Sequence, residues 1–239
     1  MMKKSFGFTL GEILIALSVI GVVASLVIPQ LVNGHKAGEA QAQFNTAYSL
    51  IAKAITDMDA DNISIKPASY SAGQALYPKF KQYSRVAIDC GDYTAESKNA
   101  SVCINQSAQS ANDEKDNYYA YSKASNTKAN ISRFDDGAFV LNNGMLVAFE
   151  NPANGYVWIS VDINGKNKMP NRWGWDLFTF ELTNDGLLPL GAPGTTATYS
   201  ADPNVYCNIN QNTSSENGAT CSYFAITNQD YFKELYKGH

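Results

Sequence analysis

The N-terminal end of the chain joins a short basic stretch to a long apolar run. Residues 1–7 contain Lys3 and Lys4, and residues 8–28 are apolar apart from Glu12 and a few small polar side chains. At about 1.5 Å per residue, a helix over 8–28 is roughly 30 Å long, which matches the hydrocarbon core of a bilayer. Because positive charge stays on the cytoplasmic side, the pattern predicts a transmembrane helix with everything after residue 28 outside the cytoplasm.

A second helical pattern follows Pro29. Apolar residues recur at three- and four-residue steps and predict one stripe that packs on a core, made of Phe44, Ala47, Tyr48, Ile51, Ala54, Ile55 and Met58. A group of acidic residues and Asn62 then ends the pattern, so we expect the N-terminal helix to cover residues 8–62. Gly34 and Gly38 each cost roughly 1 kcal/mol relative to Ala inside a helix and predict a soft stretch within it.

From residue 131 the chain has the pattern of β-strands. Residues 138–141 and 145–149 flank an Asn-Asn-Gly sequence, which is a good hairpin turn signal. Residues 156–163 and 177–182 are predicted as the next strands, which gives an antiparallel meander of at least four strands. Residues 63–130 have weak periodicity and are expected to form loops and short elements. This order of elements predicts an α+β fold.

Composition narrows the classes of function. The chain has 18 Lys and Arg against 22 Asp and Glu, a formal net charge of −4 and a pI of about 5.2, so binding of nucleic acid through charge is not expected. Its two histidines, His35 and His239, leave little room for histidine catalysis or for multi-histidine metal sites. The motifs G-x-x-x-x-G-K-[ST] and G-x-S-x-G are absent from the sequence. We therefore expect a protein that is not an enzyme.

Glu12 decides how the apolar run is interpreted. A cleaved secretory signal peptide usually has a shorter apolar segment, and a plain membrane anchor leaves the carboxylate unexplained. An acidic side chain deep in a membrane helix costs roughly 2.5–3.5 kcal/mol, so Glu12 needs a charged partner. Residues Gly7-Phe8-Thr9-Leu10-Gly11-Glu12, between a basic leader and an apolar helix, resemble the class III signal of type IV pilins and type II secretion pseudopilins. That family usually has a branched aliphatic residue where Gly11 stands.

The resemblance implies how the N-terminus is processed. A prepilin peptidase would cleave between Gly7 and Phe8, remove the leader 1–7, and methylate the new N-terminal Phe8. Glu12 would then be the fifth residue of the processed chain and would pair with the free amine of a neighbouring subunit. Pro29 would occupy the place of a helix-bending proline that many pilins have.

The resemblance also implies a fold, a location and partners. The fold would be pilin-like, with a long N-terminal helix packed on the meander, transmembrane over 8–28, and an extracytoplasmic domain over 63–239. The protein would be held in the inner (cytoplasmic) membrane and would then assemble as a structural subunit, of a size that suits a minor or enlarged one, into a type IV pilus or a type II secretion pseudopilus-like filament. Its partners would be other pilin-like subunits, the prepilin peptidase, an inner-membrane assembly platform and membrane lipid. The alternative is a membrane-anchored extracytoplasmic binding or receptor domain that does not polymerise.

Four cysteines, Cys90, Cys103, Cys207 and Cys221, occur in this exported chain without a C-x-x-C motif. They predict disulfides rather than metal ligands. Three pairings are open, of which Cys90–Cys103 with Cys207–Cys221 closes the shortest loops. The segment from Cys207 to Cys221 resembles the disulfide-bounded C-terminal region of many pilins.

One oxygen-rich loop is a candidate cation site. Asp162, Asn164 and, further on, Asp176 offer hard oxygen ligands near a D-x-N-G sequence, which is weakly similar to the opening of a calcium loop. Some pseudopilins bind calcium in a loop beside the sheet. Lys166 and Lys168 oppose a cation, however, and no bidentate Glu follows at the expected distance. A structural Asx-Gly turn is therefore favoured, and calcium, the one candidate cofactor, is the alternative.

Overall fold

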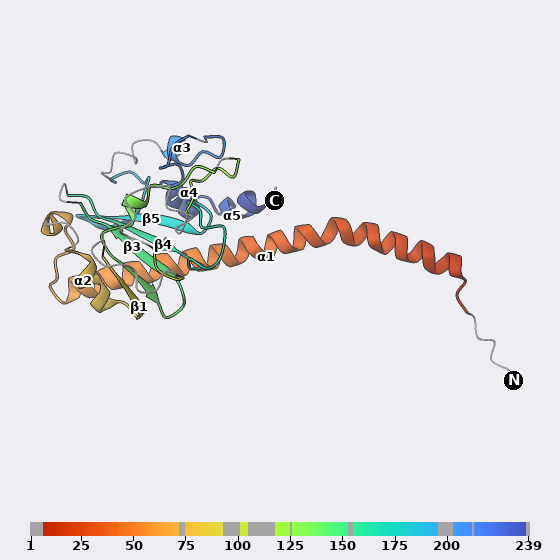
Figure 1. Cartoon of the computed structure of the whole chain (residues 1–239), viewed down its shortest axis with the longest axis horizontal. Coiled ribbons are helices and arrows are strands. Elements are labelled where there is room, and N and C mark those ends of the chain that lie inside the picture. Colours follow the sequence, from red (N-terminus) through yellow and green to blue (C-terminus); the bar gives the residue numbers. More distant parts are fainter. Residues whose placement is uncertain are drawn as a thin grey trace.

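Helix α1 (Leu10–Ala60) is 51 residues long. Its C-terminal half packs on the body of the protein, and its N-terminal half projects away from it (Figure 1). The computed structural model describes residues 7–71, 75–92, 101–104, 118–124, 126–152, 155–195, 203–211 and 213–237. Lys3, Lys4 and His239 lie outside these ranges.

The bounds of α1 agree with the helix predicted over 8–62 to within two residues at each end. Thr9 is its N-cap and Asp61 its C-cap. The helix continues without a break through Pro29 and through both glycines, so the stretch expected to be soft is helical in the structure. The projecting half and the packed half therefore belong to one continuous helix.

The packed half of α1 is defined by its buried stripe. The buried residues are Ala37, Ala40, Phe44, Ala47, Ile51, Ala54, Ile55 and Met58, which includes the whole predicted stripe apart from the half-buried Tyr48. The ring of Phe44 meets the ring of Phe178 edge-on, with centroids 4.7 Å apart, and lies 5.8 Å from that of Phe232. The predicted core role of the stripe is confirmed.

Six antiparallel strands form a meander in the order β1-β2-β3-β4-β5-β6. They are β1 (Val86–Gly91), β2 (Ala138–Leu141), β3 (Leu146–Glu150), β4 (Trp158–Asp162), β5 (Leu177–Thr183) and β6 (Gly186–Pro189). The predicted hairpin is confirmed by the pairing of β2 with β3, and β4 and β5 continue the meander as expected. The edge strands β1 and β6 were not identified from the sequence, and β1 lies in the stretch predicted to be loops and short elements. A long helix on an antiparallel sheet is consistent with the expected α+β fold.

Both faces of this sheet are covered by apolar cores. Along β2, Phe139 and Leu141 belong to the core that contains α1, whereas Ala138 and Val140 belong to the core on the other face, because successive side chains of a strand point to opposite sides. The second core includes the indole rings of Trp158 and Trp173 and is covered by segments outside the sheet. The four inner strands are therefore buried on both faces.

Short helices surround the sheet. They are η1 (Pro67–Tyr70), α2 (Tyr77–Phe80), η2 (Lys81–Tyr83), η3 (Ile131–Arg133), α3 (Pro203–Tyr206), α4 (Cys221–Thr227) and α5 (Tyr231–Tyr236). Helix α5 packs along α1, on the side of the domain from which the projecting half of α1 leaves (Figure 1). The C-terminal end of the chain is thereby placed beside the point where α1 emerges.

All four cysteines are paired in disulfides. Cys90 is joined to Cys103 and Cys207 to Cys221, with sequence separations of 13 and 14 residues. Of the three pairings left open by the sequence, the structure has the one that closes the shortest loops. The first disulfide ties β1 to the segment that follows it, and the second ties the C-terminal segment to the start of α4.

Candidate functional site

Thr9 and Glu12 close the first turn of α1 by reciprocal hydrogen bonds. The Thr9 backbone N–H and hydroxyl both donate to Oε2 of Glu12, each over 2.8 Å, and the Glu12 N–H donates to the Thr9 hydroxyl over 3.2 Å. This is a capping box, which satisfies N–H groups that a helix start otherwise leaves unpaired. Glu12 thus has a partner within its own chain, which the sequence analysis did not anticipate although the Thr-x-x-Glu spacing is its signal.

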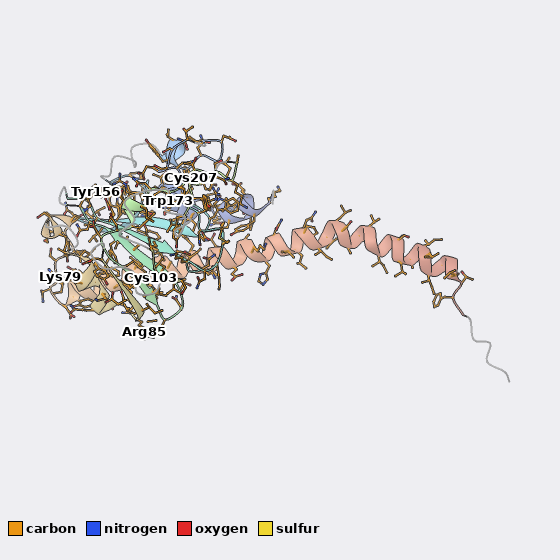
Figure 2. The ribbon with its side chains drawn as sticks, viewed as in Figure 1. Lys79, Arg85, Cys103, Tyr156, Trp173 and Cys207 are labelled. Atoms are coloured by element: carbon orange, nitrogen blue, oxygen red, sulfur yellow. A yellow bond between two sulfur atoms is a disulfide. The ribbon has the colours of Figure 1, made fainter. Side chains whose placement is uncertain are left out.

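The projecting half of α1 exposes a continuous apolar surface. Exposed large apolar side chains run from Phe8, which is 84% exposed, to Val32, which is 44% exposed. Figure 2 shows the side chains of this half standing out from the helix, away from the domain. The helix is long and apolar enough to cross a membrane. Glu12 is the only charged residue in the sequence from 8 to 32. If this segment lies in an apolar environment, the Glu12 carboxylate is therefore the one side-chain charge buried there.

The residues of the expected cleavage site lie just outside α1. Gly7 and Phe8 are exposed and precede the N-cap Thr9. A protease would therefore not have to unwind the helix to reach the bond between them. Pro29 lies inside α1 and is exposed, eight residues before Ala37, the first buried residue. Because proline has no N–H, the helix lacks one hydrogen bond near the start of its packed half.

The loop after β4 uses Asp162 as an acceptor. Its Oδ1 accepts hydrogen bonds from the backbone N–H groups of Asn164, at 3.2 Å, and Gly165, at 2.8 Å. Its Oδ2 accepts from the hydroxyl of Tyr118, at 2.6 Å. Burial raises the pKa of Asp162 to about 6, and these three donors oppose that rise because they stabilise the carboxylate. Asp162 thereby fixes the predicted Asx-Gly turn and attaches Tyr118 to the sheet.

Asp176, at the other end of the loop, also accepts hydrogen bonds from residues of the loop. Its Oδ1 accepts from the backbone N–H of Arg172 at 2.6 Å, and its Oδ2 accepts from the N–H of Asn171 at 2.8 Å and from Nδ2 of Asn164 at 3.3 Å. Burial, and then the neighbouring charge of Asp162, raise its pKa well above the ordinary value. The three candidate calcium ligands do come together, with Asn164 joining the two carboxyl groups.

These contacts decide how well the loop suits calcium. Calcium takes six to eight oxygen ligands in proteins, whereas here N–H and O–H donors of the protein point at every carboxylate oxygen. In the described part of the chain, Oδ1 of Asn164 and Oδ1 of Asn171 are buried without a hydrogen-bond partner, so two neutral oxygens remain. Lys166 donates to the carbonyl of Cys103. The donor set fits a structural turn better than a calcium site.

Arg133 forms a second polar cluster, on the side of the sheet away from α1. Its Nη1 lies 3.1 Å from Oε1 of Glu150 and 2.8 Å from the Tyr156 hydroxyl, and its Nε lies 3.3 Å from Oε1 of Glu216. The Tyr156 hydroxyl also lies 3.1 Å from Glu150 Oε1, to which it donates. One cation therefore joins η3, β3 and the C-terminal segment. No sequence pattern indicated this cluster, because its members are far apart along the chain.

Carboxyl groups outnumber cations around Arg133. Carboxylate oxygens of Asp135, Asp136 and Glu150 lie within 4.8 Å of one another. Burial, then the charge of Asp136, raise the pKa of Asp135 to about 6 and that of Glu150 to about 7, with Arg133 opposing both shifts. Glu150 is only 6% exposed, which is why burial is the main cause of the rise in its pKa.

Comparisons of the chain with models of protein families, with curated proteins and with solved structures find no match.

Proposed function

We propose that this chain is a structural subunit of a type IV pilus or a type II secretion pseudopilus-like filament, held in the inner membrane by α1 before assembly. The observation that carries the proposal is the exposed carboxylate of Glu12, one turn inside an apolar helix that projects from the domain. The capping box with Thr9 needs only an acceptor, which a neutral Gln would also supply, so a helix that served only as an anchor would not need this charge, which is costly in hydrocarbon. The proposed role is structural rather than catalytic.

The geometry supports a sequence of steps for assembly. Cleavage between Gly7 and Phe8 by a prepilin peptidase leaves a free α-amine, methylated on Phe8, one residue before the N-cap Thr9. A neighbouring subunit whose helix is shifted along the filament axis brings its own amine to Glu12. The carboxylate would then pair with a full positive charge in addition to its contacts with Thr9, and the position of this pair would set the axial shift between subunits.

The rest of the molecule suits this role. The packed half of α1 is fixed to the sheet by its buried stripe, so the domain and the projecting half move together. The disulfides are consistent with an oxidising environment outside the cytoplasm. Other pilin-like subunits, an assembly platform in the membrane and lipid are the partners that the proposal requires. A membrane-anchored binding or receptor domain that does not polymerise is the alternative.

N-terminal mass spectrometry of the protein purified from membranes, together with filament imaging, tests the proposal. The native chain should begin at methylated Phe8, and Gly7→Leu should keep residues 1–7 and form no filaments. Gly21→Leu is the matched control for cleavage, because it makes the same substitution at an exposed helical position away from the Gly7–Phe8 bond. A native chain that retains residues 1–7, or one cut within the apolar run, would contradict the proposal and favour an anchor or a secretory signal.

A further inference from the structure

A cleft separates α5 from α1 at the point where α1 leaves the domain. It has a volume of about 890 Å³ and is lined by Pro29, Gln30 and Asn33 of α1 and by Lys233, Glu234 and Lys237 at the C-terminal end of the chain. We propose that this cleft binds phospholipid headgroups, so that the domain rests on the outer surface of the membrane before assembly. The inference rests on the proposed membrane anchorage and adds a second, polar contact to it.

Depth along α1 places the cleft at the height of the headgroups. The run of exposed large apolar side chains along the projecting half of α1 ends at Val32, so the hydrocarbon layer ends between Ile28 and Val32. The headgroup layer on each side of a bilayer is about 5–7 Å thick, which corresponds to about four helical residues. Cleft residues Asn33 and Gly34 follow Val32 directly and therefore lie within this layer. Because α5 packs beside the same stretch, headgroups must meet it.

The charges around the cleft suit a lipid phosphate. Lys233 and Lys237 are exposed on its α5 side, and Lys36 is exposed on α1, in sequence between the cleft residues Gly34 and Ala37. Among the described residues, Lys36 and Lys237 make no side-chain hydrogen bond or ion pair, so all their N–H donors remain for a ligand. Cationic side chains at this height attract the phosphates of an anionic membrane surface.

Acidic groups face the same cleft, and each is already engaged within the chain. Asp230 accepts from Nζ of Lys233 at 2.8 Å, and Glu234 accepts from the Asn228 amide at 3.3 Å. The side chains of Lys233 and Asp230 are 74% and 60% exposed, and an ion pair this exposed is weak. Lys233 can therefore share its ammonium group with a phosphate. Glu39, on α1, accepts from Gln43.

Hydrogen–deuterium exchange of the full chain tests this contact. The chain is placed in vesicles of phosphatidylethanolamine and phosphatidylglycerol and, separately, in neutral detergent micelles, and flotation with the vesicles confirms insertion. The variant Lys233→Gln/Lys237→Gln removes both charges. Lys53→Gln is the control, since Lys53 is also an exposed lysine paired with an acid within one turn, but lies on the packed half of α1.

We expect amides of α5 to exchange more slowly in vesicles than in micelles, by about fivefold for each lysine that meets the surface. The double variant should lose this protection, and Lys53→Gln should keep it. Equal exchange in vesicles and micelles, from a chain that floats with the vesicles, overturns the headgroup contact and leaves the anchorage standing. A chain that does not float overturns both. Protection that grows with the protein-to-lipid ratio identifies a second copy as the occupant and also overturns the inference.

Discussion

The carboxylate of Glu12 accepts two hydrogen bonds from Thr9, and the Glu12 N–H donates one in return to the Thr9 hydroxyl. Glu12 therefore has two separable tasks under the proposed function. As an acceptor it caps its own helix, and as a charge it pairs with the amine of a neighbouring subunit. A neutral amide retains an acceptor oxygen for the first task and lacks the charge needed for the second.

The first prediction uses this difference. Glu12→Gln should leave α1 capped, inserted in the membrane and cleaved after Gly7, and it should stop filament formation. Glu12→Val should also preserve insertion and stop filaments, with a loss of capping of about 1 kcal/mol. Methylation of Phe8 is read in the same mass spectra. Filaments formed at normal yield by Glu12→Gln would show that the charge of Glu12 is not what joins the subunits.

The second prediction concerns the two disulfides. Removing Cys207–Cys221 by a double substitution to Ala should lower stability by about 3 kcal/mol, because the bridge closes a loop of about 15 residues. The pair Cys90–Cys103 closes a loop of similar length and is the comparison. Thermal unfolding of the full chain in detergent measures both losses. Peptide mapping under non-reducing conditions should find no free thiol, and four free thiols would also contradict export from the cytoplasm.

The third prediction follows from the raised pKa values of Asp135, at about 6, and Glu150, at about 7. The folded chain holds these protons more tightly than the unfolded chain does. Their contribution to stability is therefore fully present below about pH 4 and is lost as the pH rises through about 7, by an amount on the order of 2 kcal/mol. Melting temperatures of the full chain between about pH 5 and about pH 8 should fall accordingly.

Glu150→Gln separates this cluster from the other acidic groups. The substitution removes one of the two titrating groups but keeps an acceptor for Arg133 and Tyr156, so about half of the fall in melting temperature should disappear. Asp230→Asn, at an exposed carboxylate, should leave the pH dependence unchanged. An unaltered pH profile in Glu150→Gln would assign the effect elsewhere.

The fourth prediction concerns the loop that joins Asp162 to Asp176. Asp162→Asn should destabilise the fold by about 2 kcal/mol, because Tyr118 and two backbone N–H groups lose their charged acceptor. Millimolar calcium should leave the melting temperature of the native chain unchanged. A ligand that binds only the folded state must raise that temperature, so a clear rise would show that calcium does bind there.

The fold could be predicted from the sequence wherever a local pattern determines it. The stripe of α1 has the period of a helix, the four inner strands are short and largely apolar runs, and the Asn-Asn-Gly turn indicates the β2–β3 hairpin. Strand β1 has no clear signal in the sequence, because Asp89 and Gly91 have low strand propensity and its pairing with β2 is irregular. Strand β6 is four residues long and ends in Pro189, so it has too few residues for a pattern.

The candidate sites likewise include some that have a local sequence pattern and some that do not. Gly7, Phe8 and Glu12 are neighbours in sequence, and their motif can be recognised without a structure. The hydrogen bond from Asn130 to Glu216 cannot be recognised in this way. The two residues are 86 positions apart in the sequence and come into contact only when the chain has folded. Such pairs depend on the tertiary structure, and a single sequence contains no local signal for them.

The continuity of α1 has a mechanical consequence. A pull on the projecting half travels along one helix into the packed half, with no loop between them to extend first. The force then acts parallel to the contact between the buried stripe and the sheet. All the buried residues from Ala37 to Met58 resist this shear at the same time, so their contacts do not break one after another. A chain built in this way transmits tension from the projecting end of α1 to its domain without changing length.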